Sequence, residues 1–267
     1  MKPSAPFESV LITGASAGIG AGLARWYARR GGIRRLGLVA RREDKLRALQ
    51  DELQREGCRV QLFPADVGDT TIMAGVCEEF QRTSDGPQLV IANAGLSRRH
   101  MTMAGDAAGV AHLLQTNLIG VSNTLVPFIP AMRARGEGTL VAVSSMAGVA
   151  AMPGRVSYGT SKAAVDFFMR GLRRELAGTG VRAITLCPGY VATELTAGMG
   201  RTPFLLPADR AVAIMTAAIA AGKARRRFPW QLNMQTRLLS CLPDRRLQRL
   251  LTRLDARAAD ANPEPPK

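Results

Sequence analysis

Near its N-terminus the chain passes directly from a short apolar strand through a glycine-rich turn into a helix. The strand is expected over Ser9–Thr13, and the helix that follows carries Leu23, Trp26 and Tyr27. The turn between them reads Thr13-Gly14-Ala15-Ser16-Ala17-Gly18-Ile19-Gly20. Glycines let the backbone turn tightly and approach a ligand closely, and the first turn of a helix offers free N–H groups and a positive dipole end. This order of elements predicts a site for the pyrophosphate of a dinucleotide.

Strands and helices alternate along the rest of the chain. Further strands are expected at Leu36–Ala40, Arg59–Pro64, Gln88–Ala92, Thr139–Ser144, Arg182–Cys187 and Arg226–Phe228. Helices are expected at Glu43–Glu56, Asp69–Gln81, Asp106–Arg135 with interruptions, Ser157–Ala177 and Ala208–Gly222. Such alternation is typical of an α/β protein with a Rossmann-type, doubly wound parallel sheet and helices on both faces. Residues 1–229 are therefore predicted to form a single domain.

A candidate active site lies between Ser145 and Lys162. On the helix expected over Ser157–Ala177, Tyr158 and Lys162 are one turn apart, so the phenol and the ammonium can face the same side. A nearby ammonium favours the phenolate, and the lowered pKa makes the phenol useful as an acid and as a base. Ser145, at the exit of a strand, can donate to a carbonyl oxygen that gains negative charge. The three side chains predict carbonyl and alcohol chemistry, although a tyrosine and a lysine at this spacing also occur on solvated helix faces.

The second expected strand ends in Ala40-Arg41-Arg42. An enzyme that prefers the unphosphorylated dinucleotide carries an acidic residue there for the ribose 2′-hydroxyl. A guanidinium instead suits a 2′-phosphate, so Arg41 favours NADP(H), with NAD(H) as the alternative. The other interpretation is that both arginines simply begin a charged, solvated helix.

Taken together, these motifs resemble the short-chain dehydrogenase/reductase family from Ser9 to about Phe228. Their order and spacing match that family's catalytic residues at Asn117, Ser145, Tyr158 and Lys162. The resemblance assigns cofactor binding to Gly14, Ser16, Gly18, Ile19, Gly20, Arg41, Asp66, Val67, Asn93, Ala94, Gly95, Tyr158, Lys162, Pro188, Gly189, Val191 and Thr193. One departure is Ala17, where many NADP-preferring relatives carry a basic residue.

The family resemblance implies an oxidoreductase that transfers a hydride between NADP(H) and a carbonyl or alcohol. Tyr158 would then deliver the proton, Ser145 would hydrogen-bond the substrate oxygen, and Lys162 would hold the nicotinamide ribose. Asn117 would anchor a water that relays protons from Lys162. The resemblance also implies a homodimer or homotetramer built through the helices expected at Ser157–Ala177 and Ala208–Gly222. A catalytically idle dinucleotide sensor or scaffold is the alternative, but such proteins usually lack the tyrosine or the lysine.

The segment Tyr190–Pro207 is expected to close over the substrate. It is largely apolar and includes Leu195, Met199, Phe204, Leu205 and Leu206. This composition favours an apolar ketone or alcohol as the small-molecule substrate, although ordinary packing of a lid would need the same side chains.

Composition limits the cellular setting and the metal chemistry. The sequence contains no apolar run of 18 residues and no secretory signal, so a cytoplasmic location is expected. Cys58, Cys77, Cys187 and Cys241 are widely spaced and fall in predicted strands and helices, which favours reduced, buried thiols. The two histidines have no partner at ligand spacing, so no metal site is expected.

Much of the formal net charge of +15 lies after Gly222. Two helices, at about Trp230–Cys241 and Asp244–Ala256, are expected to form a basic extension over residues 230–256, before a disordered tail over 257–267. In the second helix Leu247, Leu250, Leu251 and Leu254 form one apolar stripe. The stripe fits packing on the domain, contact with a partner subunit, or weak peripheral contact with an anionic membrane. Nucleic-acid binding is not expected, because no recognition motif accompanies the basic residues.

Overall fold

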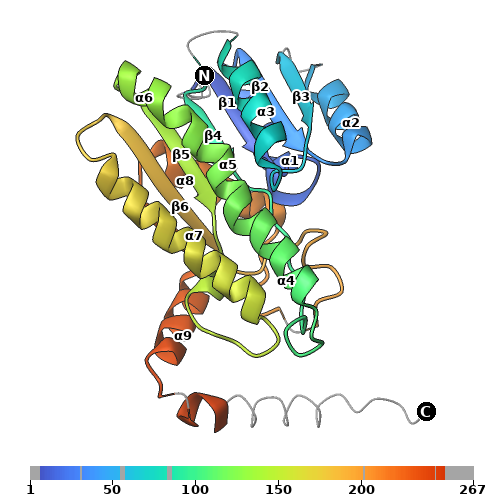
Figure 1. Ribbon diagram of the computed structural model, residues 1–267, viewed down its shortest axis with the longest axis vertical. Helices are drawn as coiled ribbons and strands as arrows, with labels where there is room; N and C mark the ends of the chain where they lie inside the picture. The colour runs from blue at the N-terminus through green and yellow to red at the C-terminus, as the bar shows by residue number, and fades with distance from the viewer. Residues whose placement is uncertain are drawn as a thin grey trace.

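The computed structural model describes residues 7–30, 32–54, 58–82, 86–200, 202–243 and 245–249 (Figure 1). Within these residues, seven parallel strands form a sheet in the order β3-β2-β1-β4-β5-β6-β7. The strands are β1 (Ser9–Thr13), β2 (Arg35–Ala40), β3 (Val60–Pro64), β4 (Leu89–Ala92), β5 (Gly138–Val143), β6 (Val181–Pro188) and β7 (Arg225–Phe228). The chain order reverses between β1 and β4, and in open α/β sheets ligands bind at the carboxyl ends of the strands beside such a point.

Helices cover both faces of the sheet. The α-helices are α1 (Gly18–Arg30), α2 (Glu43–Gln54), α3 (Thr70–Arg82), α4 (Ala107–Leu114), α5 (Gly120–Leu125), α6 (Ile129–Arg135), α7 (Val156–Glu175), α8 (Ala208–Ala220) and α9 (Trp230–Ser240). Buried side chains of α1, α2 and α8 share one core with the strands, and those of α3, α5 and α7 share the other. The doubly wound parallel fold predicted from the sequence is therefore confirmed.

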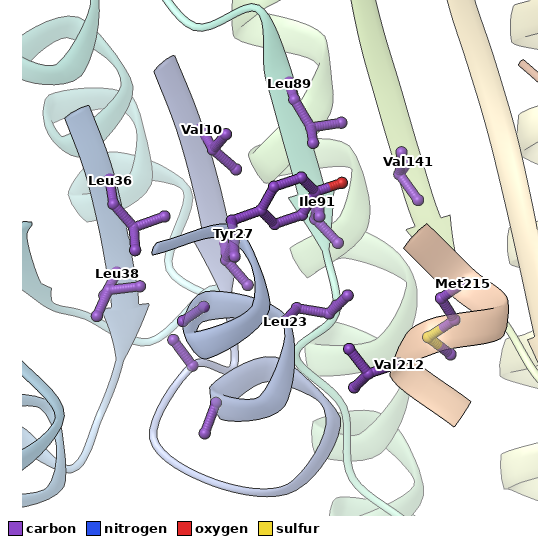
Figure 2. Packing of buried hydrophobic residues seen from close by; sticks show 14 of the residues in the cluster. Val10, Leu23, Tyr27, Leu36, Leu38, Leu89, Ile91, Val141, Val212 and Met215 are labelled. Atoms are coloured by element: carbon purple, nitrogen blue, oxygen red, sulfur yellow. The ribbon is translucent and has the colours of Figure 1, made fainter. Parts of the chain in front are cut away.

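The first core shows why the strands read as nearly continuous apolar runs. Figure 2 shows Val10, Leu36, Leu89 and Val141 of four neighbouring strands on the side of the sheet where Leu23 and Tyr27 of α1 and Val212 and Met215 of α8 pack. The next residue along β1, Leu11, belongs to the opposite core. A strand in a sheet covered on both faces must bury both sets of side chains, so its sequence loses the polar–apolar alternation.

The interrupted helix expected over Asp106–Arg135 is a chain of short helical segments. A π-helical turn, η1 (Gln115–Ile119), joins α4 to α5, and a 3₁₀ turn, η2 (Val126–Phe128), joins α5 to α6. Pro127 lies in η2 and Pro130 at the start of α6, and each proline removes an N–H donor from the helical hydrogen bonds. The π-helical turn contains Asn117, whose side chain is fully buried.

The C-terminal segment is described only in part. Of the helix expected over Asp244–Ala256, the structure describes residues 245–249, which are helical, whereas Leu250, Leu251 and Leu254 of the leucine stripe and the tail over 257–267 lie outside the described residues. Cys241 is exposed just after α9, so burial was wrongly predicted for this thiol, whereas Cys58, Cys77 and Cys187 are buried and free. Across the described part of the chain, no helix combines the length and the apolar character that crossing a bilayer requires.

Candidate active site

The glycine turn after β1 is held in place by β4. The Thr13 hydroxyl accepts hydrogen bonds from the backbone N–H groups of Asn93 (3.1 Å) and Ala94 (3.3 Å). The Asn93 amide in turn donates to the carbonyl oxygens of Thr13 (3.1 Å) and Gly14 (3.3 Å). Two elements that are far apart in sequence are thereby joined at the point where the sheet order reverses.

Close backbone approach requires the glycines of this turn. Gly14 has a φ of +66°, and a Cβ there would lie 2.7 Å from the Cα of Ala94. A Cβ on Gly20 would overlap the carbonyl oxygen of Gly14, so this glycine lets α1 pack against its own turn. Gly18 has a φ of +55° and faces the Thr193 side chain. The turn thus leaves the N-terminus of α1 open to a ligand, as a pyrophosphate site requires.

A cavity of about 1220 Å³ runs along the carboxyl ends of the strands from this turn to α9. It is larger than the usual range of small-molecule sites, roughly 300–1,000 Å³, and can hold a dinucleotide together with a substrate. Of the residues proposed from the sequence, the cavity is lined by Gly14, Ser16, Gly18, Ile19, Arg41, Asp66, Val67, Asn93, Ala94, Gly95, Ser145, Tyr158, Lys162, Pro188, Gly189, Val191 and Thr193. Gly20 and Asn117 do not line it and act from behind its wall.

Ser145 and Tyr158 meet at the middle of the cavity. Ser145 follows β5, and its hydroxyl accepts a hydrogen bond from the N–H of Ala147 (3.1 Å) in the 3₁₀ turn η3 (Met146–Gly148). Burial raises the pKa of the Tyr158 phenol above its ordinary value, and this rise is opposed by a hydrogen bond with Ser145 and by the positive charge of Arg155. The phenol is therefore protonated near neutral pH.

Lys162 is not among the groups that lower the pKa of Tyr158, and this pKa is raised, so the prediction that Lys162 keeps it low is wrong. Its Nζ donates to the carbonyl oxygen of Val143 (2.9 Å) and lies 5.9 Å from the centre of the Tyr158 ring. Desolvation lowers the pKa of the buried ammonium itself to about 8. The helical spacing correctly predicted that the phenol and the ammonium lie on one side of α7. It could not predict that the ammonium donates its hydrogen bond to the Val143 carbonyl.

Asn117 connects the loop after β4 to α7. Its carbonyl oxygen accepts from the N–H of Leu96 (2.7 Å), and its amide donates to the Leu96 carbonyl (2.9 Å) and to the Ser161 hydroxyl (3.0 Å). A Cβ on Gly95 would lie 3.3 Å from Asn117 Oδ1 and 3.4 Å from Lys162 Nζ. The asparagine and the lysine therefore approach the same glycine, and Asn117 positions the wall of the cavity around Lys162.

Both arginines after β2 line the cavity, but they have different partners. Arg41 lies 3.6 Å from the carboxylate of Asp66. Arg42 donates to the Ser16 hydroxyl (3.1 and 3.3 Å) and forms an ion pair with Glu194 (2.9 Å). The hydrogen bond with Arg42 and its positive charge hold the pKa of Glu194 below its usual value. Arg42 was not among the binding residues assigned from the sequence, although it directly follows Arg41.

Helix α9 supplies one wall of the substrate end. The side chains that line the cavity there include Leu232, Gln235, Thr236, Leu238, Leu239 and Leu242. Leu195, Met199, Pro203 and Phe204 contribute from the segment expected to close over the substrate. Residues 230–256 were predicted to form an extension. No sequence motif marks α9 as a wall of the cavity, because it reaches this position through long-range packing.

Comparisons with known proteins agree with this geometry. The family model described as short chain dehydrogenase matches residues 8–203. An uncharacterized oxidoreductase of Myxococcus xanthus (strain DK1622) is 38% identical over 239 residues, which cover 89% of this chain and 94% of the relative. A solved short-chain dehydrogenase from Sphingobium yanoikuyae in complex with NADPH is 29% identical, with a TM-score of 0.76 and coverage of 88% of this chain and 96% of the other.

A second solved structure is the bulky-bulky ketone specific alcohol dehydrogenase from Comamonas testosteroni. It is 25% identical, with a TM-score of 0.74 and coverage of 88% of this chain and 94% of the other. The family model extends over more than half of the chain, and its range includes β1, the glycine turn, Ser145, Tyr158 and Lys162. This chain belongs to the short chain dehydrogenase family of oxidoreductases.

Proposed function

We propose that this protein transfers a hydride between NADP(H) and the carbonyl or alcohol group of an apolar substrate. The observation that carries the proposal is that Ser145, Tyr158 and Lys162 line the same cavity as the glycine turn. A binding site for a dinucleotide and a proton donor for a carbonyl oxygen are thus continuous.

The chain's own residues have distinct tasks in such a reaction. A bound nicotinamide supplies or accepts the hydride. Tyr158 holds the proton that the substrate oxygen receives on reduction, because burial keeps its phenol protonated. Ser145 hydrogen-bonds the same oxygen as negative charge develops on it. Lys162, whose ammonium is held at the Val143 carbonyl, would bind the nicotinamide ribose, while Asn117 positions the wall around it.

Features of this structure fit a dinucleotide. The positive φ angles of Gly14 and Gly18 leave room beside the N-terminus of α1, where helix N–H groups suit a pyrophosphate. At the adenosine end Arg41, Arg42 and the Ser16 hydroxyl offer donors for a 2′-phosphate. These donors support a preference for NADP(H) over NAD(H). We therefore assign binding of the 2′-phosphate to Arg42 as well as to Arg41. The relative from Sphingobium yanoikuyae, solved with NADPH, agrees with this preference.

The substrate end supports a large apolar body. Leu232 and Leu239 of α9 line the cavity together with Met152, Met199 and Phe204, and the cavity is large enough for a substrate beside a dinucleotide. The similarity to an alcohol dehydrogenase named for bulky-bulky ketones points in the same direction. A purely structural role of these side chains would not require them to border an open cavity.

Two further proposals concern partners. We propose a homo-oligomer that uses α7, because this helix exposes Phe167 (71%) and Val156 (55%) to solvent. Weak peripheral contact with an anionic membrane remains a proposal for the basic C-terminal segment, which includes Arg245, Arg246 and Arg249. A cytoplasmic location is proposed on the sequence argument given above.

A screen of ketones and alcohols with both cofactors tests the proposed function. With aryl and long-chain alkyl ketones, the protein should oxidise NADPH faster than NADH. The absorbance of the reduced nicotinamide measures both rates. Absence of turnover with every carbonyl, in a protein that binds NADPH, would favour the idle sensor or scaffold.

A further inference from the structure

Arg155 is a cation inside the catalytic cavity whose partners are neutral. It immediately precedes α7 and lines the cavity together with Tyr158, three residues further on. One Nη lies 3.4 Å from the Met199 sulfur, and the guanidinium carbon lies 5.7 Å from the centre of the Tyr190 ring. Within the described residues, no carboxylate forms an ion pair with Arg155.

The other two described arginines that line this cavity each form an ion pair with a carboxylate. Arg41 is paired with Asp66 and Arg42 with Glu194, both at the adenosine end. A guanidinium has five N–H donors, and a thioether sulfur is a weak acceptor. Arg155 therefore has more donors than these neutral partners use, and it lines a cavity to which Ala147, Ala150 and Met152 also contribute.

A purely apolar ligand would be a poor match for this wall. By filling the substrate end, it would remove water from the guanidinium without replacing the lost hydrogen bonds, which costs free energy. A substrate with an anionic oxygen group would replace that water with a charge-assisted, bidentate pair.

The position of Arg155 also limits where such a group can lie. Burial raises the pKa of Tyr158, and the charge of Arg155 is close enough to act against this rise. Arg155 is the N-cap of α7 and Tyr158 lies in its first turn, and both side chains line the same cavity. One substrate can therefore place an anionic group at Arg155 and its carbonyl at Tyr158.

We infer that the substrate is an oxo acid or hydroxy acid with a large apolar body, and that Arg155 binds its carboxylate. The inference rests on the proposed function for the reaction itself and adds the class of substrate. The guanidinium of Arg155 lies over the Tyr190 ring and contacts Met199, and so connects the start of α7 to the segment Tyr190–Pro207.

Ligand binding without turnover provides the first test. The ligands are decanoate and decanol, titrated by calorimetry into the parent, Arg155→Met, Arg155→Lys and Arg170→Met. Arg170 is an exposed arginine on the same helix, beside Phe167 and outside the cavity lining, so its variant is a matched control. Thermal melts of all four proteins check that each is folded.

Decanoate should bind the parent and Arg170→Met equally, and Arg155→Met about tenfold to hundredfold more weakly. Arg155→Lys should recover part of this loss, and decanol, which cannot neutralise the guanidinium, should bind Arg155→Met at least as tightly as the parent. Equal binding of decanoate to the parent and Arg155→Met, or no binding of decanoate to the parent, would overturn the inference.

Turnover separates this inference from the proposed function. With NADPH, 5-oxodecanoate should have a lower KM than its methyl ester in the parent, and the difference should disappear in Arg155→Met. Turnover of neutral ketones without any preference for the acid would refute the role of Arg155 alone. Arg155-dependent binding of decanoate without turnover of any carbonyl would refute the proposed reaction alone.

Discussion

The ammonium of Lys162 donates a hydrogen bond to the backbone carbonyl of Val143, at 2.9 Å, and not to Tyr158 one turn away. Lys162 is almost fully buried, and burial lowers its pKa to about 8. An unfolded chain would return this lysine to its ordinary pKa of about 10.4. Between these two values the unfolded state binds more protons than the folded state, so this group makes stability rise with pH.

Replacement of this lysine should change the pH dependence of stability in a defined direction. The charged lysine destabilises the cofactor-free parent most below about pH 8, by an amount on the order of 3 kcal/mol. Methionine does not titrate, so the Tm of Lys162→Met minus that of the parent should be largest below pH 8 and should fall towards pH 10. Thermal melts at half-unit steps measure this difference. A difference independent of pH would show that the lysine is not desolvated as described.

Adding one methyl group at Gly20 of the glycine turn should strongly lower the stability of the protein. Gly20→Ala would place its Cβ against the Gly14 carbonyl and the Asn93 amide, so it should destabilise the protein by about 3 kcal/mol or more. Gly75→Ala is the matched control, because that exposed glycine of α3 has nothing within 4 Å of an added Cβ. It should stabilise the protein by about 0.5–1 kcal/mol. Urea unfolding of both variants measures these changes, and equal effects would contradict the described turn.

The proposed preference for NADP(H) rests on the two arginines after β2. Arg42→Ala removes donors that we assign to the 2′-phosphate, so NADPH should bind about tenfold to hundredfold more weakly. NADH binding should change less than about twofold, because NADH has no 2′-phosphate. Arg41→Asp should shift the preference towards NAD(H) in the same way. Fluorescence titration measures both cofactors, and a parent that already prefers NADH would refute the assignment.

The carboxylate of Glu194 should weaken the binding of the 2′-phosphate of NADPH. Its carboxylate occupies Arg42 at 2.9 Å and lies 3.8 Å from Lys45, so a 2′-phosphate must share or displace these partners. Glu194→Gln should therefore tighten NADPH binding and leave NADH binding nearly unchanged. Weaker NADPH binding in this variant would mean that the ion pair assembles the site and does not compete for it.

Local sequence patterns were sufficient for most of the fold and for predicting that Ser145, Tyr158 and Lys162 lie together, as they do in one cavity. The strand, glycine turn and helix at Ser9–Thr13 and beyond, and the spacing of Tyr158 and Lys162, each concern residues close together in the chain. Their geometry follows from backbone preferences and from the helical repeat. The seven strands of the described sheet and both covered faces followed from the same alternation.

Features that depend on long-range packing were not predictable in this way. The Val143 carbonyl that binds Lys162, the Glu194 carboxylate that binds Arg42 and the α9 side chains that line the cavity all come from distant segments. Arg155 carried no motif of its own, and its isolation from acidic partners was visible only once the surrounding elements were placed. The burial of Tyr158, which reverses the expected direction of its pKa shift, depends on the same packing.

The central claim is that Tyr158 transfers the proton in carbonyl reduction, and Tyr158→Phe tests it most directly because it removes one hydroxyl from a buried ring. NADPH binding, measured by fluorescence, and the Tm should stay close to those of the parent. The rate of NADPH oxidation with a ketone that the parent reduces should fall by about 10²–10⁴-fold, the usual contribution of general acid catalysis. A rate within tenfold of the parent, in a folded variant that binds NADPH, would contradict the account.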